Sequence, residues 1–218
     1  MKQHYVVVGL GMFGTHVART LYEAGCDVVV LDRDRDAIQR ARDFASRAIV
    51  ADVTKRENLE SLALESKDVV IIAMGESLES SILATLYFKE MGIEKIIAKA
   101  NVEDHGKILA KVGASEVIYP EKDVALRLAR RISSQNIIDF IPLVEGYSIE
   151  EVAVSKAIVG RRIRDLDLRR KYGVQIIAVK DVIENQVELI IDPDRIIKDS
   201  ELMILLGKNS DLERIRSL

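Results

Sequence analysis

The sequence has little of what builds disulfide frameworks, metal clusters or membrane spans. Its 218 residues include one cysteine, three prolines, three histidines and no tryptophan. The lone Cys26 cannot form an internal disulfide, and no CxxC or HxxxH spacing is present to hold a metal. The longest uncharged apolar runs, 69–74 and 202–206, are much shorter than the roughly 20 residues of a membrane-spanning helix.

Charge and composition narrow the class of protein further. The chain carries 32 Lys and Arg against 35 Asp and Glu, a formal net charge of -3, which argues against nucleic acid as a main partner. Because 48% of the residues are hydrophobic and 31% are charged, we expect a globular chain with one sizeable core and a smaller one. No segment resembles a signal peptide, so a cytoplasmic location is expected.

The strongest positive signal is a GxGxxG motif that follows an apolar, β-branched run. Gly9 permits a tight turn, Gly11 lets a phosphate approach the backbone, and Gly14 lets helix and strand pack closely. The helix that begins here offers unpaired N–H groups to an anion. Asp32 ends the next apolar run, about 20 residues on, where a carboxylate accepts hydrogen bonds from ribose hydroxyls. This context predicts a nucleotide site.

Strands and helices alternate over residues 1–135. Apolar runs rich in Val and Ile predict six strands, at 4–8, 27–31, 48–50, 69–73, 95–98 and 116–119. Helical patterns begin near Met12, Arg35, Arg56, Ser77, Glu103 and Lys122. The alternation predicts an α/β domain with an open, parallel Rossmann-type sheet of order 3-2-1-4-5-6 and a ligand at the carboxyl ends of its strands.

The pattern changes after Pro120. Residues 121–140 are predicted to form one long helix that serves as a crossover or dimerising element, with one apolar face made by Val124, Ala125, Leu128, Ile132 and Ile137. Further strands are predicted at 149–154, 175–180, 187–190 and 202–206, with a helical stretch at 161–171 and a short helix after Ser210. Residues 141–218 are therefore predicted to form a smaller, antiparallel α+β domain. Such a short segment is a marginal core for a monomer, so self-association is expected.

A Rossmann-type domain suits both a nucleotide-binding regulator and a NAD-dependent oxidoreductase with a small dimerisation domain. A dehydrogenase needs an acid or base at the nicotinamide face, yet the second half of the chain contains no histidine. No Walker A or nucleophile-elbow motif is present. His4 and His16 are expected to be surface or packing residues. His105 opens a helix at the ligand edge and fits a phosphate contact or a surface position equally well.

Segments along the whole chain resemble the KTN or RCK regulatory subunits of potassium transporters and channels, typified by the TrkA and KtrA proteins. They are Val8-Gly-Leu-Gly-Met-Phe-Gly14, Leu31-Asp-Arg-Asp34, Ala51-Asp-Val-Thr54, Ile72-Ala-Met-Gly-Glu76, Ala98-Lys-Ala-Asn101, Tyr119-Pro-Glu-Lys-Asp123 and Lys171-Tyr-Gly-Val174. The resemblance implies a non-enzymatic, cytosolic subunit that assembles into homo-oligomeric, octameric rings. Such rings gate an integral membrane, potassium-translocating subunit according to the nucleotide bound.

Placed on the predicted sheet, these segments form a pocket for an adenine nucleotide. The resemblance implies that Arg33 and Asp34 border the adenosine and that Asp52, with Val53, accepts from the adenine amino group. It also implies that Lys99 neutralises a phosphate, the alternative being an ordinary exposed lysine. The full set of implied binding residues is Gly9, Gly11, Met12, Phe13, Gly14, Asp32, Arg33, Asp34, Asp52, Val53, Ala73, Met74, Gly75, Glu76, Lys99, Ala100, Asn101, His105 and Glu121.

The expected ligand is ATP or ADP, with NAD(H) close behind. Many KtrA-type sequences carry an arginine where this chain has Met12, so the cation that would read a terminal phosphate is missing. Arg33 suits the 2′-phosphate of NADP, but Asp32 opposes it. Glu121 is implied to approach the phosphates, where Mg²⁺ or Ca²⁺ would relieve the repulsion; the alternative is a solvated acid near a helix N-terminus.

The carboxyl-terminal domain raises a second ligand question. Its basic stretch, residues 161–171, interleaves arginines with acids and apolar residues, which favours a solvated amphipathic helix over an anion site. In some KtrA proteins this domain binds cyclic di-AMP, so the resemblance implies the same second effector as a hypothesis here.

Overall fold

The structure is a computed structural model that describes residues 3–75, 77–133 and 137–216. It divides into two compact parts, Met1–Lys122 and Asp123–Leu218, called unit 1 and unit 2 below. This division falls before the predicted domain boundary. No helix within the described residues is long and apolar enough to cross a membrane.

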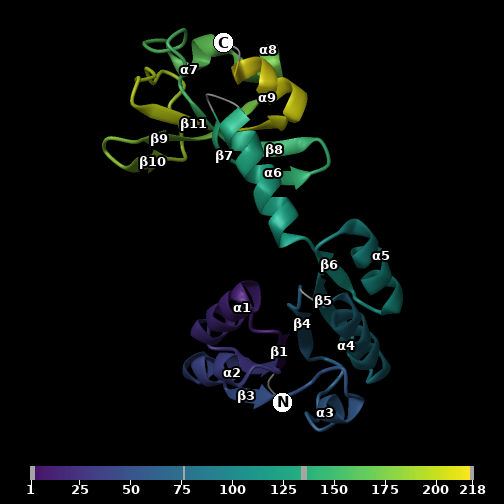
Figure 1. The fold of residues 1–218 in the computed structure, drawn as a ribbon. Coiled ribbons are helices and arrows are strands. Elements are labelled where there is room, and N and C mark those ends of the chain that lie inside the picture. The colour runs from purple at the N-terminus through teal and green to yellow at the C-terminus, as the bar shows by residue number, and fades with distance from the viewer. Residues whose placement is uncertain (1–2, 76, 134–136, 217–218) are drawn as a thin grey trace. The chain divides into compact units, whose positions relative to one another are not determined.

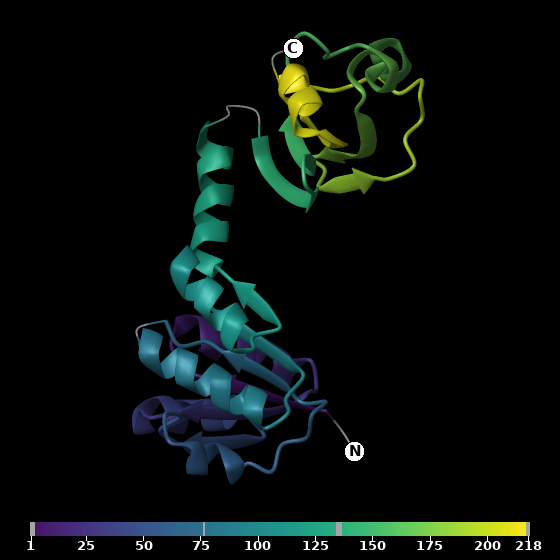
Figure 2. The same cartoon turned by 90° about the vertical axis from the view of Figure 1, so that its right-hand side faces the viewer.

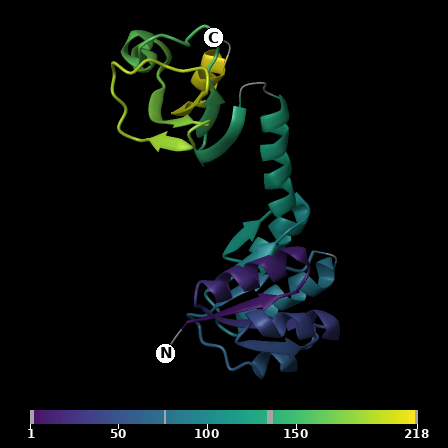
Figure 3. The ribbon, with the colours of Figure 1, turned by 90° about the vertical axis from the view of Figure 1, so that its left-hand side faces the viewer.

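Unit 1 contains the predicted parallel sheet. Its strands are β1 (His4–Val8), β2 (Asp27–Asp32), β3 (Arg47–Val50), β4 (Val69–Ile72), β5 (Lys95–Lys99) and β6 (Glu116–Ile118). They lie in the order β3-β2-β1-β4-β5-β6, with every neighbouring pair parallel (Figure 1). In Figure 3 the purple arrow of β1 starts near the N-terminus. The predicted strand order is confirmed.

Helices cover both faces of this sheet. One face packs on α1 (Met12–Glu23), α2 (Arg35–Ala41) and η1 (Arg42–Phe44), and the other on α3 (Arg56–Glu60), α4 (Leu78–Glu90) and α5 (Glu103–Val112). Neighbouring residues of β1 belong to opposite cores, because Val6 and Val8 pack with Phe88 while Val7 packs with Ala18. Apolar side chains on both faces explain why the strands are nearly continuous hydrophobic runs.

The prediction of one long helix at 121–140 is wrong from residue 137 onward. Helix α6 spans Pro120–Ser133, and β7 spans Ile137–Val144. Residues 134–136 lie outside the described residues. β7 pairs with β8 (Tyr147–Ala153) through a turn at Gly146, whose φ is +81°. The ladder with β8 overrides the helical pattern, and Pro142 is tolerated because β7 is an edge strand.

Unit 2 is built on an antiparallel sheet of order β10-β9-β11-β8-β7. The remaining strands are β9 (Gln175–Asp181), β10 (Gln186–Glu188) and β11 (Glu201–Lys208). The predicted helix at 161–171 is instead two short helices, α7 (Ile163–Leu166) and α8 (Leu168–Tyr172), because Asp167 between them has a left-handed φ of +46°. Helix α9 (Asn209–Arg216), yellow in Figure 2, packs on β8 and β11.

Candidate functional site

The glycine motif forms the turn from β1 to α1, and its three glycines differ. Gly9 has a φ of +91°, and a Cβ there would lie 2.8 Å from Met74 Cγ. A Cβ on Gly14 would overlap the carbonyl oxygen of Gly9. Gly11 has a φ of -65°, and a Cβ there would meet nothing within 4 Å. The fold thus requires glycine at the first and last positions, while the space over Gly11 is open to a ligand.

Asp32, at the end of β2, holds the glycine turn in place. Its Oδ2 accepts the Leu10 N–H at 2.6 Å, and its Oδ1 accepts the Asp34 N–H at 2.9 Å. An ionised carboxylate offers about four acceptor positions, so two remain for ribose hydroxyls. The predicted ribose contact agrees with this position at the carboxyl end of β2 and stays a prediction.

The residues implied for the adenosine lie on the same edge of the sheet. Arg33 and Asp34 are exposed, and Asp34 accepts a backbone N–H at the start of α2. Asp52, also exposed, accepts hydrogen bonds from the Thr54 hydroxyl at 2.7 Å and the Thr54 N–H at 3.0 Å, which lower the pKa of Asp52. An ionised Asp52 can accept from an amino group. Val53, beside Asp52, is buried in the core, and its contact with a ligand stays a prediction.

The loops after β4 and β5 meet next to the glycine turn. Asn101 Nδ2 donates to the Gly75 carbonyl oxygen at 2.5 Å, and a Cβ on Gly75 would lie 3.2 Å from Lys99 Nζ. Lys99 Nζ also lies 6.0 Å from the centroid of the Phe13 ring on α1. The loop after β4, the end of β5 with its loop, and the first turn of α1 therefore converge where a phosphate was predicted. Glu76 lies outside the described residues.

Lys99 is not the ordinary exposed lysine of the alternative interpretation. Its side chain is 11% exposed, and its Nζ lies 2.5 Å from Glu121 Oε1 at the start of α6. This hydrogen bond lowers the pKa of Glu121. Neither interpretation of Glu121 included a lysine partner, because the two residues are 22 positions apart and meet only through the fold.

His105 is buried, which contradicts the surface position offered for it, while its contact with a phosphate stays a prediction. Its side chain is 2% exposed, and its Nε2 lies 2.8 Å from the Ser81 hydroxyl oxygen on α4. Burial lowers the pKa of His105, which favours the neutral ring. The residue is therefore a packing residue between α4 and α5. Ala73 and Ala100 are also core residues, whereas Met12 is 84% exposed at the start of α1.

No group of three or more His, Cys, Asp or Glu that could hold a metal occurs in residues 3–75, 77–133 and 137–216. Glu121 is a single carboxylate already engaged by Lys99. The phosphates of a ligand would have to supply further oxygen ligands to any Mg²⁺ or Ca²⁺ there. The divalent-cation role of Glu121 stays a prediction.

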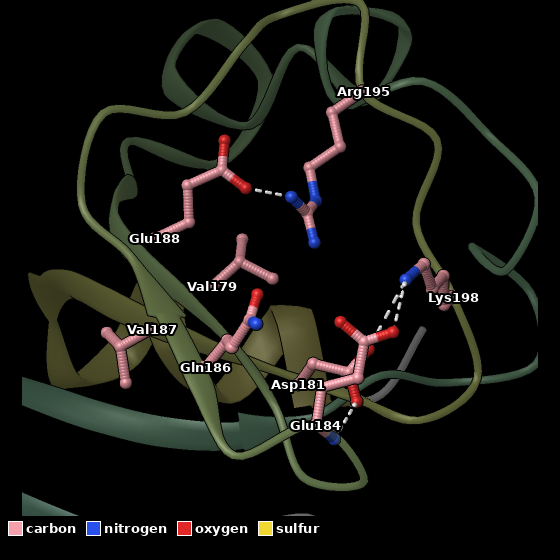
Figure 4. A pocket seen from close by; sticks show the side chains of 8 residues that line it. All are labelled: Val179, Asp181, Glu184, Gln186, Val187, Glu188, Arg195 and Lys198. Atoms are coloured by element: carbon pink, nitrogen blue, oxygen red, sulfur yellow. Dashed lines mark hydrogen bonds and ion pairs between the residues drawn. The ribbon is translucent and has the colours of Figure 1, made fainter.

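Unit 2 contains a polar cavity of about 300 Å³ that the sequence did not predict (Figure 4). Its lining residues are Val179, Asp181, Glu184, Gln186, Val187, Glu188, Arg195 and Lys198. The charges are paired with one another, Arg195 with Glu188 and Lys198 with Asp181. Burial raises the pKa of Asp181, but the N–H groups of Glu184 and Ile183 and the Lys198 ammonium lower it overall. Both cations of the lining are thus engaged by its own carboxylates, which outnumber them three to two.

The basic stretch 161–171 is also partly neutralised within unit 2. Arg162 and Arg164 bind Asp194 Oδ1, at 3.1 and 2.8 Å. Asp194 belongs to a turn in which the Asp192 side chain accepts the Asp194 N–H. These two arginines therefore stabilise a turn, which favours the solvated-helix interpretation over an anion site at their positions.

Fold and site together define a Rossmann-type α/β protein with an appended antiparallel domain. The TrkA-N domain family matches residues 5–120, and the TrkA-C domain family matches residues 148–218. The chain belongs to the TrkA and Ktr family of potassium uptake proteins. It is 37% identical over 216 residues to the Ktr system potassium uptake protein C of Bacillus subtilis (strain 168), which covers 98% of this chain and 96% of that protein.

A second relative and a solved structure extend the comparison. The Ktr system potassium uptake protein A of Vibrio alginolyticus is 34% identical over 219 residues, covering 99% of this chain and 98% of that protein. The GsuK channel bound to NAD superposes with a TM-score of 0.67 at 18% identity, covering 97% of this chain and 38% of that one. This likeness shows a shared fold over nearly the whole chain.

Proposed function

We propose that this chain is a nucleotide-sensing regulatory subunit of a potassium uptake system. Both domain families match in the expected order, and relatives named as Ktr potassium uptake proteins align over almost their full length. These full-length matches support potassium uptake as the process and a subunit as the role. The membrane partner is a potassium-translocating protein.

The proposed ligand is an adenine nucleotide, ATP or ADP, with NAD(H) as the second candidate. The observation that carries this proposal is Gly11, the one glycine of the motif that neither backbone conformation nor packing requires. It lies at the N-terminus of α1, where backbone N–H groups face an anion. The NAD that GsuK binds contains an ADP moiety, which supports the same ligand class on the same fold.

The proposed mechanism is a shift of conformational population without chemistry. Chains assemble into a homo-oligomeric, octameric ring, and nucleotide binding favours one of two ring conformations. A ligand shifts this equilibrium only by the difference in its affinity for the two conformations. The membrane subunit then responds to the conformation of the ring.

Gly11→Val tests the nucleotide site with little effect on the free fold. In a thermal-shift assay, ATP, ADP or NADH should raise the melting temperature of the wild-type chain, because a ligand at 100 times its Kd adds about 2.7 kcal/mol. Gly11→Val should lose the ligand-induced rise, and its own melting temperature should fall only slightly, because valine is a poorer N-cap residue than glycine. Asp32→Ala is a weaker test because Asp32 also holds Leu10. If no adenylate moves the wild-type melting curve, the nucleotide proposal is wrong.

Two further measurements test the role itself. A bacterial strain without its own potassium uptake, carrying a Ktr-type membrane subunit, should take up rubidium faster when this chain is added. Light scattering should give a mass near eight chains. The alternative, a NAD-dependent oxidoreductase, predicts steady loss of NADH absorbance with a metabolite mixture and no effect on uptake.

Binding of cyclic di-AMP in unit 2 stays a prediction. Calorimetry with cyclic di-AMP on the full chain is the test.

A further inference from the structure

Lys99 lies at the centre of the proposed phosphate region, and it already forms an ion pair with Glu121. Its ammonium lies 2.5 Å from Glu121 Oε1, beside Gly75 and within 6.0 Å of the Phe13 ring. The lysine is largely buried, whereas the glutamate side chain is 65% exposed. Glu121 is therefore the partner that can move away into solvent, while Lys99 is held at the strand end.

A phosphate near Gly11 would compete with Glu121 for this lysine. Both are anions that bind an ammonium by charge-assisted hydrogen bonds. Lys99 carries one positive charge, so a phosphate and a carboxylate together at its Nζ leave a net negative cluster, which is repulsive. Unless a cation intervenes, binding of one anion weakens binding of the other.

We propose that Glu121 is a built-in competitor for the phosphate of the ligand, and that phosphate binding transfers Lys99 from Glu121 to the ligand. This inference rests on the proposed nucleotide site. The exchange sets a threshold, because every phosphate must displace the carboxylate before it gains the lysine. It also discriminates by charge, since adenosine without phosphate leaves the ion pair intact.

The exchange gives the ligand a direct effect on the first turn of α6. In the described structure two ion pairs join this turn to β5 and α5: Lys99 with Glu121, and Glu103 with Lys122 at 2.7 Å. Phosphate binding would break the first and leave the second. The second pair joins the same turn to the start of α5, so Glu103→Gln is a matched control that removes one surface carboxylate.

The test is a double-mutant cycle on nucleotide affinity. Calorimetry in EDTA would measure the Kd of ADP and of adenosine for the wild type, Glu121→Gln, Lys99→Gln and the double variant. Glu121→Gln should tighten ADP at least about threefold, the scale of one partly exposed ion pair. The same change made in the Lys99→Gln background should have a clearly smaller effect. Adenosine affinity, and ADP affinity of Glu103→Gln, should match the wild type.

The outcomes separate this inference from the proposed function. Glu121→Gln could tighten ADP binding equally in the wild-type and Lys99→Gln backgrounds. In that case Glu121 would simply repel the phosphate, and the proposed transfer of Lys99 would be wrong. Unchanged or weaker ADP binding by Glu121→Gln in EDTA would also overturn it, while the nucleotide site stands. A wild type that binds neither ADP nor adenosine overturns both. Repeating the titrations with Mg²⁺ shows whether a cation reverses the effect of Glu121→Gln, as the divalent-ion role of Glu121 requires.

Discussion

The two units stabilise their sheets by different means. Unit 1 has a hydrophobic cluster on each face of its sheet, whereas unit 2 has one cluster in its described part. Buried carboxylates show the opposite trend: Asp68 in unit 1, but Glu150, Asp181 and Glu201 in unit 2. Apolar packing and glycine contacts thus hold the nucleotide loops, while in unit 2 paired charges join Arg195 and Lys198 to the ends of β9, β10 and β11. Substitutions should therefore act on the two units through different physics.

The largest expected effect is the loss of unit 1 in Gly14→Val. Any Cβ at this position overlaps the Gly9 carbonyl oxygen, which is backbone and cannot rotate away. The turn between β1 and α1 would have to open, so we expect destabilisation by more than about 4 kcal/mol. Circular dichroism during urea unfolding would measure it. Gly11→Val is the matched control; equal destabilisation by both variants would contradict the distinction drawn between the two glycines.

In unit 2 the corresponding weak point is a buried charge. Glu201, which is 1% exposed, accepts from Arg195 at 2.6 Å and from the Lys198 N–H at 3.0 Å. Arg195→Met leaves this carboxylate without its cation, which typically costs about 3–5 kcal/mol of unfolding free energy. Urea unfolding would measure the loss.

The double variant Arg195→Met/Glu201→Met is the control for this prediction. It removes the buried charge together with its cation, so we expect it to be more stable than Arg195→Met, although Glu188 loses its arginine and the Lys198 N–H its acceptor. A double variant as unstable as Arg195→Met alone would show that packing, rather than charge, makes Arg195 important.

The difference between the two units also explains which strands and helices could be predicted from the sequence. The strands of unit 1 are buried on both faces, so hydrophobic runs located all six, and the alternation of strands with helices predicted their order. β7 was missed because its first residues, 137–140, were included in the predicted helix, and only the ladder with β8 shows that they form a strand. The break at Asp167 depends on a backbone conformation that residue type alone does not specify.

The candidate site divides in a similar way. The glycine motif and Asp32 were predictable because their spacing is fixed by local geometry, a turn followed by one strand and one helix. The ion pair between Lys99 and Glu121 and the burial of His105 were not. Each depends on contacts between elements that are distant in the sequence, Lys99 with α6 and His105 with α4.

A smaller effect is expected from pH, and it should originate in unit 1. His105 is buried, and its pKa in the folded chain is lowered by burial. The unfolded chain therefore binds a proton below its ordinary pKa of about 6.5 that the folded chain does not. Stability should fall as the pH drops below that value, by at most about 1.4 kcal/mol per pH unit for this group. Urea unfolding between pH 7.5 and 5.5 would measure it.

His105→Gln is the control for the pH effect. Glutamine can still hydrogen-bond the Ser81 hydroxyl but does not titrate, so the variant should lose this part of the pH dependence. His4 and His16 remain in both proteins, which makes the difference between the two pH profiles specific to residue 105. Identical profiles would contradict the neutral, buried state of this ring.

The smallest effect on stability is expected for Ile190→Ser, which also tests whether an apolar surface of unit 2 is covered by another chain. Ile190 is 92% exposed, and Ile183 and Leu189 are 81% and 70% exposed. Replacing a fully exposed side chain should change the unfolding free energy by less than about 0.5 kcal/mol.

The same variant tests the assembly of chains. If this apolar surface is covered in the proposed ring, Ile190→Ser should dissociate at a higher protein concentration than the wild type, as seen by light scattering. Met12→Ser, which removes an 84% exposed side chain from unit 1, should leave the assembly unchanged. Equal assembly of Ile190→Ser and the wild type would place the contacts between chains elsewhere and leave this surface as a solvent-exposed apolar patch.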